Sequence, residues 1–166
     1  MRNLIGTLVL LLSIGLHGCD RSGDERGSVV EANKQLDKKL AEGFRSKNLD
    51  QIMSCWWNSP DVINIPADNA GVRKGYDLVR AAIKLQLDGI DRVLAFKFAE
   101  QDYMVFDDVV VGTGKIHFHV KPKGAPHPVL LTIFYTDLRQ RRNGNWVYTY
   151  SHESLPPSPV EIAAGP

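Results

Sequence analysis

The feature that most constrains the fold is a change in hydrophobic period at Val93. Before this residue, apolar side chains recur every three or four positions, as along one face of a helix. After it, apolar and polar residues alternate over four long segments, the last of which stops at Pro156 and Pro157. Helices followed by such strands predict an α+β fold, in which three helices cover the concave face of a curled antiparallel sheet. A sheet of this shape encloses a conical cavity.

The alternating segments set the predicted strands. They cover residues 93–106, 109–121 and 129–142, and a last strand follows the turn Asn143-Gly144-Asn145. In the second strand, one face carries the series Val110, Gly112, Gly114, Ile116 and Phe118. We expect the helices to cover this face, because glycine lets a helix approach closely or a strand curl.

Three helices and one short strand are predicted ahead of the sheet. The first helix begins at the capping box Ser28 to Glu31 and ends at Asn48, which tolerates left-handed geometry. The second covers residues 49–57, and a brief strand at residues 62–66 precedes the third helix at residues 76–87. In the third helix, the residues expected to face inward are Leu78, Val79, Ala82, Ile83 and Leu87.

The N-terminal segment resembles a bacterial lipoprotein signal. An apolar run at residues 4–16 follows Arg2 and leads directly into Leu16-His17-Gly18-Cys19. This run is too short for a transmembrane helix, which needs about 20 apolar residues. We therefore expect residues 1–18 to be removed as a signal peptide. Acyl chains such as palmitate on Cys19 would then anchor the protein in a membrane of the bacterial cell envelope, facing the periplasm or the exterior. A secretory signal cleaved nearby, or a short N-terminal anchor, is the alternative.

The remaining chain is one domain by length. Residues 19–27 are predicted as a flexible tether, residues 28–157 as the domain and residues 158–166 as a disordered tail. Without residues 1–18, the chain holds 19 basic and 19 acidic residues, because Arg2 is lost. This balance argues against nucleic acid as a partner.

Cys55 is the only thiol left once Cys19 is acylated, so no intramolecular disulfide is expected. It lies in an apolar helical stretch, away from a helix N-terminus, which predicts a buried and inert cysteine. The neighbouring Trp56 and Trp57 are expected to pack in the core, and one of them can also line a pocket.

The last strand predicts a distinctive surface. Its alternation places Trp146, Tyr148, Tyr150 and His152 on one face, and Ser151 and Glu153 on the other. Aromatic rings followed by an imidazole are typical of an apolar pocket with a polar group at its mouth. His152 is therefore a candidate ligand contact or acid–base group, the alternative being a structural histidine bonded to a backbone carbonyl.

Motifs spread along the chain resemble the SnoaL-like branch of the nuclear-transport-factor-2-like superfamily. They are Lys47-Asn48-Leu49-Asp50, Trp57 with Asp61-Val62, Val72-Arg73-Lys74-Gly75, Asp108 to Val111, Thr132, Gly144-Asn145-Trp146 and His152-Glu153-Ser154. The resemblance covers residues 29–156 and implies a cone-shaped α+β domain that is commonly dimeric through its outer sheet face. It implies no single activity, because the superfamily includes isomerases, cyclases, dehydratases, assembly domains and proteins that only bind.

The ketosteroid isomerases of this superfamily carry their general base as an aspartate just before a proline, after the first short strand. Here that place is Ile65-Pro66, so the resemblance supplies no base. Asp61 and Asp68 lie nearby, but aspartates at such a junction usually cap or turn the chain. Asp61 stays a candidate catalytic residue and a candidate polar group of the pocket.

His117 and His119 share a strand face, and a metal site completed by His127 or His152 is conceivable. No cysteine or carboxylate cluster follows at ligand spacing, and this face lies opposite the apolar one. We interpret these histidines as outer-surface or dimer-interface residues, and we expect no metal and no cofactor.

The domain is expected to bind an unknown small, largely apolar molecule without catalysis. The predicted lining is Phe44, Trp57, Phe118, Phe134, Tyr148 and Tyr150, with His152 and Asp61 as polar groups. One alternative is an isomerase, cyclase or dehydratase that uses His152 as its acid–base group. Another is a ligand-free assembly domain whose pocket is filled by side chains.

A homodimer is expected through the outer sheet face, which is too apolar to leave in water. The residues predicted on that face are Val111, Thr113, His117, Leu131, Ile133 and Tyr135.

Overall fold

The fold is α+β, as the sequence predicts. The computed structural model describes residues 21–67 and 71–156. Its helices are α1 (Arg21–Arg45), α2 (Leu49–Met53) and α3 (Tyr76–Asp88). Its strands are β1 (Ile63–Ile65), β2 (Arg73–Lys74), β3 (Ile90–Phe106), β4 (Val109–Pro122), β5 (Val129–Arg142) and β6 (Asn145–Ser154).

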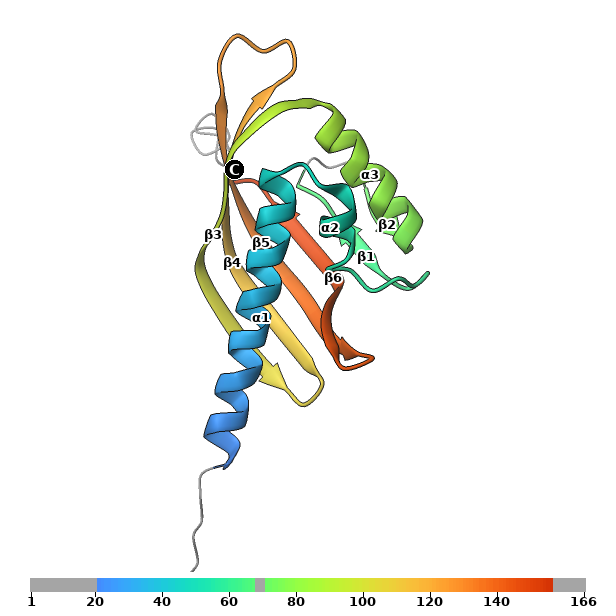
Figure 1. Ribbon diagram of the computed structural model, residues 1–166, viewed down its shortest axis with the longest axis vertical. Coiled ribbons are helices and arrows are strands. Elements are labelled where there is room, and N and C mark those ends of the chain that lie inside the picture. Colours follow the sequence, from blue (N-terminus) through green and yellow to red (C-terminus); the bar gives the residue numbers. More distant parts are fainter. Residues whose placement is uncertain (1–20, 68–70, 157–166) are drawn as a thin grey trace, which may run out of the picture.

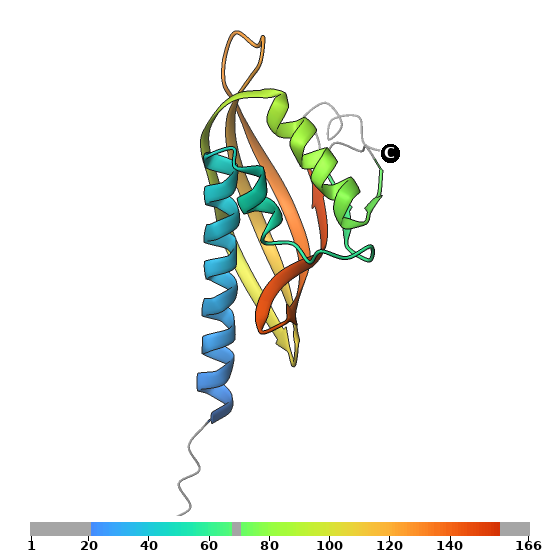
Figure 2. The same ribbon diagram turned by 45° about the vertical axis from the view of Figure 1, so that its right-hand side comes forward.

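The strands form one six-stranded sheet with the order β2-β1-β6-β5-β4-β3. All neighbouring pairs are antiparallel except β1 and β6, which run parallel. The sheet curls without closing, and the helices lie on its concave side (Figures 1 and 2). Helix α1 runs along β3, whereas α3 crosses the far end of the sheet.

The long strands lie where the alternation predicts them. The turn at Asp107-Asp108 and the limits of β5 are confirmed. On β4, Val110, Ile116 and Phe118 are buried, so the face predicted to meet the helices does so. Strand β2 was not predicted, because two residues are too few to establish an alternation.

Helix α1 begins at Arg21, seven residues before the predicted capping box. The Ser28 hydroxyl donates to the Glu25 carbonyl at 2.7 Å, so Ser28 lies inside the helix and does not cap it. Residues 21–27, predicted as part of a flexible tether, are helical. The predicted signal peptide, Cys19 and the predicted tail at 158–166 lie outside the described residues.

The junction between α1 and α2 differs in detail from the prediction. Lys47, and not Asn48, takes the left-handed conformation, with φ 55°. The Asn48 side chain instead accepts from the Gln51 N–H at 3.0 Å and caps α2. Helix α2 ends at Met53, after which the Tyr148 N–H donates to the Cys55 carbonyl at 2.9 Å. Residues 55–57 therefore join the edge of β6 and are not helical.

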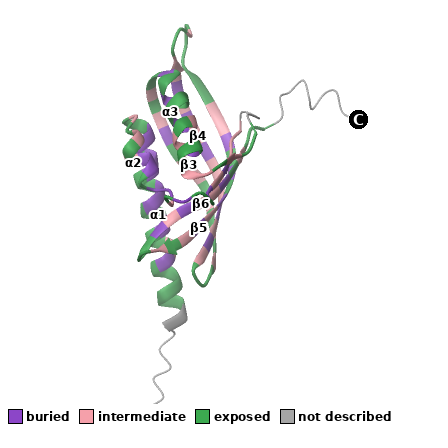
Figure 3. Ribbon diagram, turned by 90° about the vertical axis from the view of Figure 1, so that its right-hand side faces the viewer, coloured by how far each residue is buried: buried purple, intermediate pink, exposed green. Residues whose placement is uncertain are grey.

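Helix α3 packs on the sheet through a stripe at i, i+4 and i+8, made of Val79, Ile83 and Leu87. The prediction that Leu78 faces inward is wrong, because it lies beside this stripe and is 61% exposed. Buried residues concentrate on the surfaces where helices and sheet meet (Figure 3). Within the described ranges, no helix combines the length and apolarity that a membrane crossing requires.

Candidate functional site

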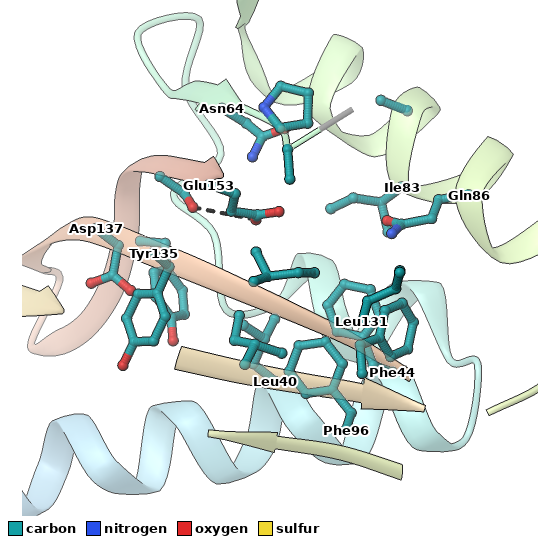
Figure 4. Close-up of a pocket in the computed structure, with 18 of the residues that line it drawn as sticks. Leu40, Phe44, Asn64, Ile83, Gln86, Phe96, Leu131, Tyr135, Asp137 and Glu153 are labelled. Carbon is teal, nitrogen blue, oxygen red and sulfur yellow. Dashed lines mark hydrogen bonds between the residues drawn. The ribbon is translucent and has the colours of Figure 1, made fainter. Parts of the chain in front are cut away.

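A pocket of about 300 Å³ lies between the concave sheet face and the helices (Figure 4). This volume is at the lower end of the range of small-molecule sites, roughly 300–1,000 Å³. The apolar lining comes mainly from Leu40 and Phe44 of α1, Ala82, Ile83 and Leu85 of α3, Phe96 and Phe98 of β3, Ile116 and Phe118 of β4, and Leu131 and Ile133 of β5. The polar lining is Asn64, Arg73, Gln86, Tyr135, Asp137, Tyr148, Ser151 and Glu153.

One wall of the pocket is aromatic. Phe44 stacks on Phe96 with ring centroids 4.5 Å apart, and Phe118 meets Phe96 edge to face at 5.1 Å. Phe98 makes a similar edge contact with Tyr135 at 5.4 Å. These contacts hold the rings in fixed positions, and each such pair contributes about 0.5–1.5 kcal/mol beyond its buried area.

A bulge in β6 reverses the expected faces of the last strand. Tyr148 pairs with Arg139 and Tyr150 pairs with the adjacent Leu138, so Thr149 is an extra residue on β6. Beyond Thr149, the residues that face inward are therefore Ser151 and Glu153. The prediction that His152 lies on the pocket face is wrong, since its side chain is exposed on the opposite face.

The predicted site residues divide into two groups. Phe44, Phe118 and Tyr148 line the pocket, where their contact with a ligand stays a prediction. The residues that do not line it are Trp57, Phe134, Tyr150, His152 and Asp61. Trp56 takes the place expected of Trp57, because the irregular segment after α2 turns Trp56 inward. Asp61 is exposed in a turn where its N–H donates to the Ser59 hydroxyl at 3.1 Å. Asp68 lies outside the described residues.

The placement of Leu131, Ile133 and Tyr135 on the outer face is also wrong. Ile133 pairs with Ile116 and Leu131 with Phe118, and directly paired residues share a face. These three residues therefore line the pocket. Strand β5 is apolar on both faces near its start, so its own alternation does not reveal which face is inner.

Polar groups gather where β1, β2 and β6 meet. The Arg73 guanidinium donates to Asn64 Oδ1 at 3.4 Å, and the Ser151 hydroxyl donates to Glu153 Oε1 at 3.5 Å. In Figure 4, the Glu153 carboxylate points into the pocket below Asn64 and faces Ile83 and Gln86. The sequence analysis missed these residues because they reach the pocket only through the bulge and through strand pairing.

A buried ion cluster closes the pocket toward α1. Arg139, fully buried, lies 2.9 Å from Asp37 of α1 and 2.8 Å from Asp137 on its own strand. The Tyr103 hydroxyl donates to Asp37 Oδ2 at 2.6 Å, and the Tyr148 hydroxyl donates to Asp37 Oδ1. Burial raises the pKa of Asp137 to about 6, although Arg139 opposes this effect.

The cluster fixes Tyr148, which lines the pocket. Burial raises the pKa of Tyr148 well above its usual value, so it stays a hydroxyl donor to Asp37. The Tyr135 hydroxyl is buried and has no hydrogen-bond partner among the described residues. The sequence signal for the cluster is Asp137-x-Arg139, two charged residues that continue the apolar series Leu131, Ile133 and Tyr135 along one strand face.

Other reactive side chains lie away from the pocket. His117 and His119 are half-buried on the outer sheet face, opposite the helices. In residues 21–67 and 71–156, no three His, Cys, Asp or Glu side chains come together in a way that suits a metal ion. Cys55 is buried, and its pKa is raised by burial to about 11, which keeps the thiol protonated.

Comparison with known proteins identifies the family. A model of the SnoaL-like domain matches residues 34–158. The chain belongs to the SnoaL-like family. No curated protein matches this SnoaL-like chain.

Solved structures show the same fold. A nuclear transport factor 2-like superfamily protein from Salmonella enterica superposes with a TM-score of 0.73 at 13% identity, covering 81% of this chain and 95% of its own. The hexachlorocyclohexane dehydrochlorinase LinA-type3 from Novosphingobium barchaimii superposes with a TM-score of 0.69 at 17% identity, covering 80% of this chain and 90% of its own. A protein of unknown function from Pseudomonas putida superposes with a TM-score of 0.69 at 15% identity, covering 81% of this chain and 92% of its own. At these identities, the SnoaL-like domain shares a fold with them, and its function must come from its own pocket.

Proposed function

We propose that this SnoaL-like domain binds a small, largely apolar molecule in its cone pocket and catalyses no reaction. The observation that carries the proposal is an open volume of about 300 Å³ with mostly apolar walls. Apolar walls favour an apolar ligand, because its burial removes apolar surface from water and adds packing contacts with the lining. The same volume argues against a ligand-free assembly domain, in which side chains would fill the cone.

An isomerase, cyclase or dehydratase remains the second candidate class, and the structural similarity to a dehydrochlorinase favours it. The histidine that it requires, His152, is exposed and does not line the pocket. The carboxylate Asp137 lines the pocket but is bound twice by Arg139, at 2.8 and 3.0 Å. Binding is therefore the function that the residues support best.

The test compares two neighbouring alanines of α3. Ala82 lines the pocket, whereas Ala81 is exposed on the same helix. Propylbenzene, a neutral apolar probe, should bind the wild-type domain in an NMR titration, and Ala82→Phe should weaken its binding at least tenfold. The matched control Ala81→Phe should leave the dissociation constant unchanged. No binding to the wild type, or equal effects of both variants, would overturn the proposal.

We further propose that acylated Cys19 tethers the domain to a membrane of the bacterial cell envelope, facing the periplasm or the exterior. The support is the apolar run that ends at Cys19. Each buried methylene of an acyl chain contributes roughly 0.8 kcal/mol to membrane affinity. Cys19→Ser should move the protein out of the detergent phase in a partition assay, and unchanged partitioning would show that the anchor is something else.

A homodimer through the outer sheet face is the last part of the proposal. Strands β3 and β5 expose Met104, Phe106, Leu130 and Phe134 there, with exposed fractions between 40% and 61%. Their pairing partners place them opposite the pocket. Exposed apolar side chains spread over one sheet face are typical of an interface between protein subunits.

A further inference from the structure

We propose that the pocket takes an elongated molecule with one unbranched hydrocarbon chain, which lies along the sheet and leaves the pocket between Leu85 of α3 and Leu155 beyond β6. This inference rests on the proposed binding function and names the shape and chemistry of the ligand. Its support is an apolar track that runs across the strands from β3 to the mouth of the pocket.

Two rows of paired apolar side chains form the floor of this track. Strand pairing places the first row side by side on β3, β4 and β5, and its members are Phe96, Phe118 and Leu131. The second row lies on the same three strands and consists of Phe98, Ile116 and Ile133. All of these residues line the pocket. Since directly paired side chains share a sheet face, each row is a continuous apolar strip.

The second row continues beyond the last strand to Leu155. Ser154 pairs with Phe134, so Leu155, the next residue along the chain, follows at the level of Ile133. Leu155 also lines the pocket. From Phe98 to Leu155 the row therefore covers three strand spacings of about 4.8 Å, roughly 14 Å in all.

The pocket is long and narrow. Its volume of about 300 Å³ extends over this track of roughly 14 Å, and a round cavity that wide would be several times larger. Helix side chains form the opposite wall, where Ile83 of α3 lies across the pocket from Phe96 (Figure 4). A single chain fills such a shape, whereas a compact ring system would leave one end of the track without packing contacts.

The apolar lining does not stop at the mouth. Leu85 lines the pocket although 75% of it is exposed, and Leu155 lines it although 46% is exposed. Residues that both line a pocket and face solvent lie at its rim. A ligand held wholly inside would leave both leucines in water, whereas a chain that passes between them removes their apolar surface from water. The rim therefore suits a ligand longer than the pocket.

The polar lining can border such a chain because its groups bind one another. Arg73 donates to Asn64 Oδ1 at 3.4 Å, and the Ser151 hydroxyl donates to Glu153 Oε1 at 3.5 Å. The buried ion cluster holds Asp137. Polar groups that are already bonded within the protein lose no partner when a hydrocarbon chain replaces the water beside them.

A series of 1-alkanols tests the length of the track. In NMR titrations of the wild-type domain, the dissociation constant should fall from 1-hexanol to 1-octanol to 1-decanol, by up to about fourfold for each added methylene. Ala82→Phe should weaken all three alkanols, which assigns them to the pocket. An affinity that stops rising beyond 1-hexanol, or alkanol affinities that Ala82→Phe leaves unchanged, would overturn the inference.

Two exposed leucines of α3 provide a matched pair. Leu85 lies at the mouth, whereas Leu78 is 61% exposed on the same helix and does not line the pocket. Leu85→Ser should raise the dissociation constant of 1-decanol by roughly threefold or more, and should leave that of 1-hexanol within about twofold, because only the longer chain reaches the rim. Leu78→Ser should change neither. Leu155→Ser repeats the test from the other side of the rim and should act as Leu85→Ser does.

Equal losses for 1-hexanol and 1-decanol in Leu85→Ser, or the same loss in Leu78→Ser, would overturn the inference. Propylbenzene separates this outcome from a failure of the proposed function. If propylbenzene binds the wild type while the alkanols show no dependence on the rim, the pocket binds compact apolar molecules and the proposed function stands. Failure of propylbenzene and of all three alkanols to bind the wild type would overturn the proposed function instead.

Discussion

Arg139 of β5 and Asp37 of α1 form an ion pair of 2.9 Å in which neither side chain is more than 3% exposed. The pair joins the helix to the inner sheet face beside the pocket. Arg139 also binds Asp137, and two tyrosine hydroxyls donate to Asp37. Charges removed from water are stable only with such a complete set of partners. The pocket wall and the packing of α1 therefore depend on the same side chains.

Replacing Arg139 should destabilise the domain severely. Arg139→Met leaves Asp37 and Asp137 buried without their cation, so we expect the free energy of unfolding to fall by about 3–5 kcal/mol. Urea denaturation measures the loss. The control Arg141→Met removes an exposed guanidinium that lies over Trp146 at 5.2 Å, and should cost about 1 kcal/mol or less. Similar losses in both variants would contradict a structural role for the cluster.

The stability of the domain should depend on pH through Asp137. Its pKa is about 6 in the folded protein and near 3.8 as an ordinary aspartate, so the folded state holds the proton more tightly. The stabilisation is complete below pH 3.8 and is lost as the pH rises to about 6. The free energy of unfolding relative to Asp137→Asn, which does not titrate, should thus fall by roughly 2–3 kcal/mol across this window. A constant difference between pH 4 and pH 7 would contradict the assignment.

Two tyrosines separated by the bulge provide a matched pair. The Tyr148 hydroxyl donates to buried Asp37, whereas Tyr150 lies beyond Thr149 on the outer face. Tyr148→Phe should lower the free energy of unfolding by about 1.5–3 kcal/mol, because it removes a hydrogen bond to a charged group. Tyr150→Phe should change it by less than about 0.5 kcal/mol. Thermal or urea unfolding of both variants tests which tyrosine of β6 faces inward. A larger loss of stability in Tyr150→Phe than in Tyr148→Phe would argue against the bulge.

The proposed dimer can be tested on the corrected outer face. Phe134 is 40% exposed there, so Phe134→Asp should shift the protein toward monomer in sedimentation at micromolar concentration. Val72→Asp, at a 65% exposed position before α3, serves as the control and should leave the oligomeric state unchanged. Ile133 is unsuitable for this test because it is buried in the pocket wall, and a charge there should unfold the domain. A monomeric wild type would contradict the proposal.

Local signals in the sequence determined the architecture. The period of 2 after Val93, the turn at Asp107-Asp108 and the stop at Pro156 each act over a few residues. They gave the limits of β5 and the order of helices before sheet without reference to distant contacts. The inner face of β4 was also predictable, since Ile116, Phe118 and Val120 alternate there with polar residues.

Tertiary structure decided the contents of the pocket. One extra residue at Thr149 exchanges the two faces of β6, so Glu153 enters the pocket and His152 leaves it. A one-residue shift has this effect because side chains alternate strictly along a strand. The ion pair of Asp37 with Arg139 joins residues 102 positions apart, and no local pattern brings such residues together. The sequence by itself thus determined the α+β cone, whereas the pairing of its strands selected the residues that line it.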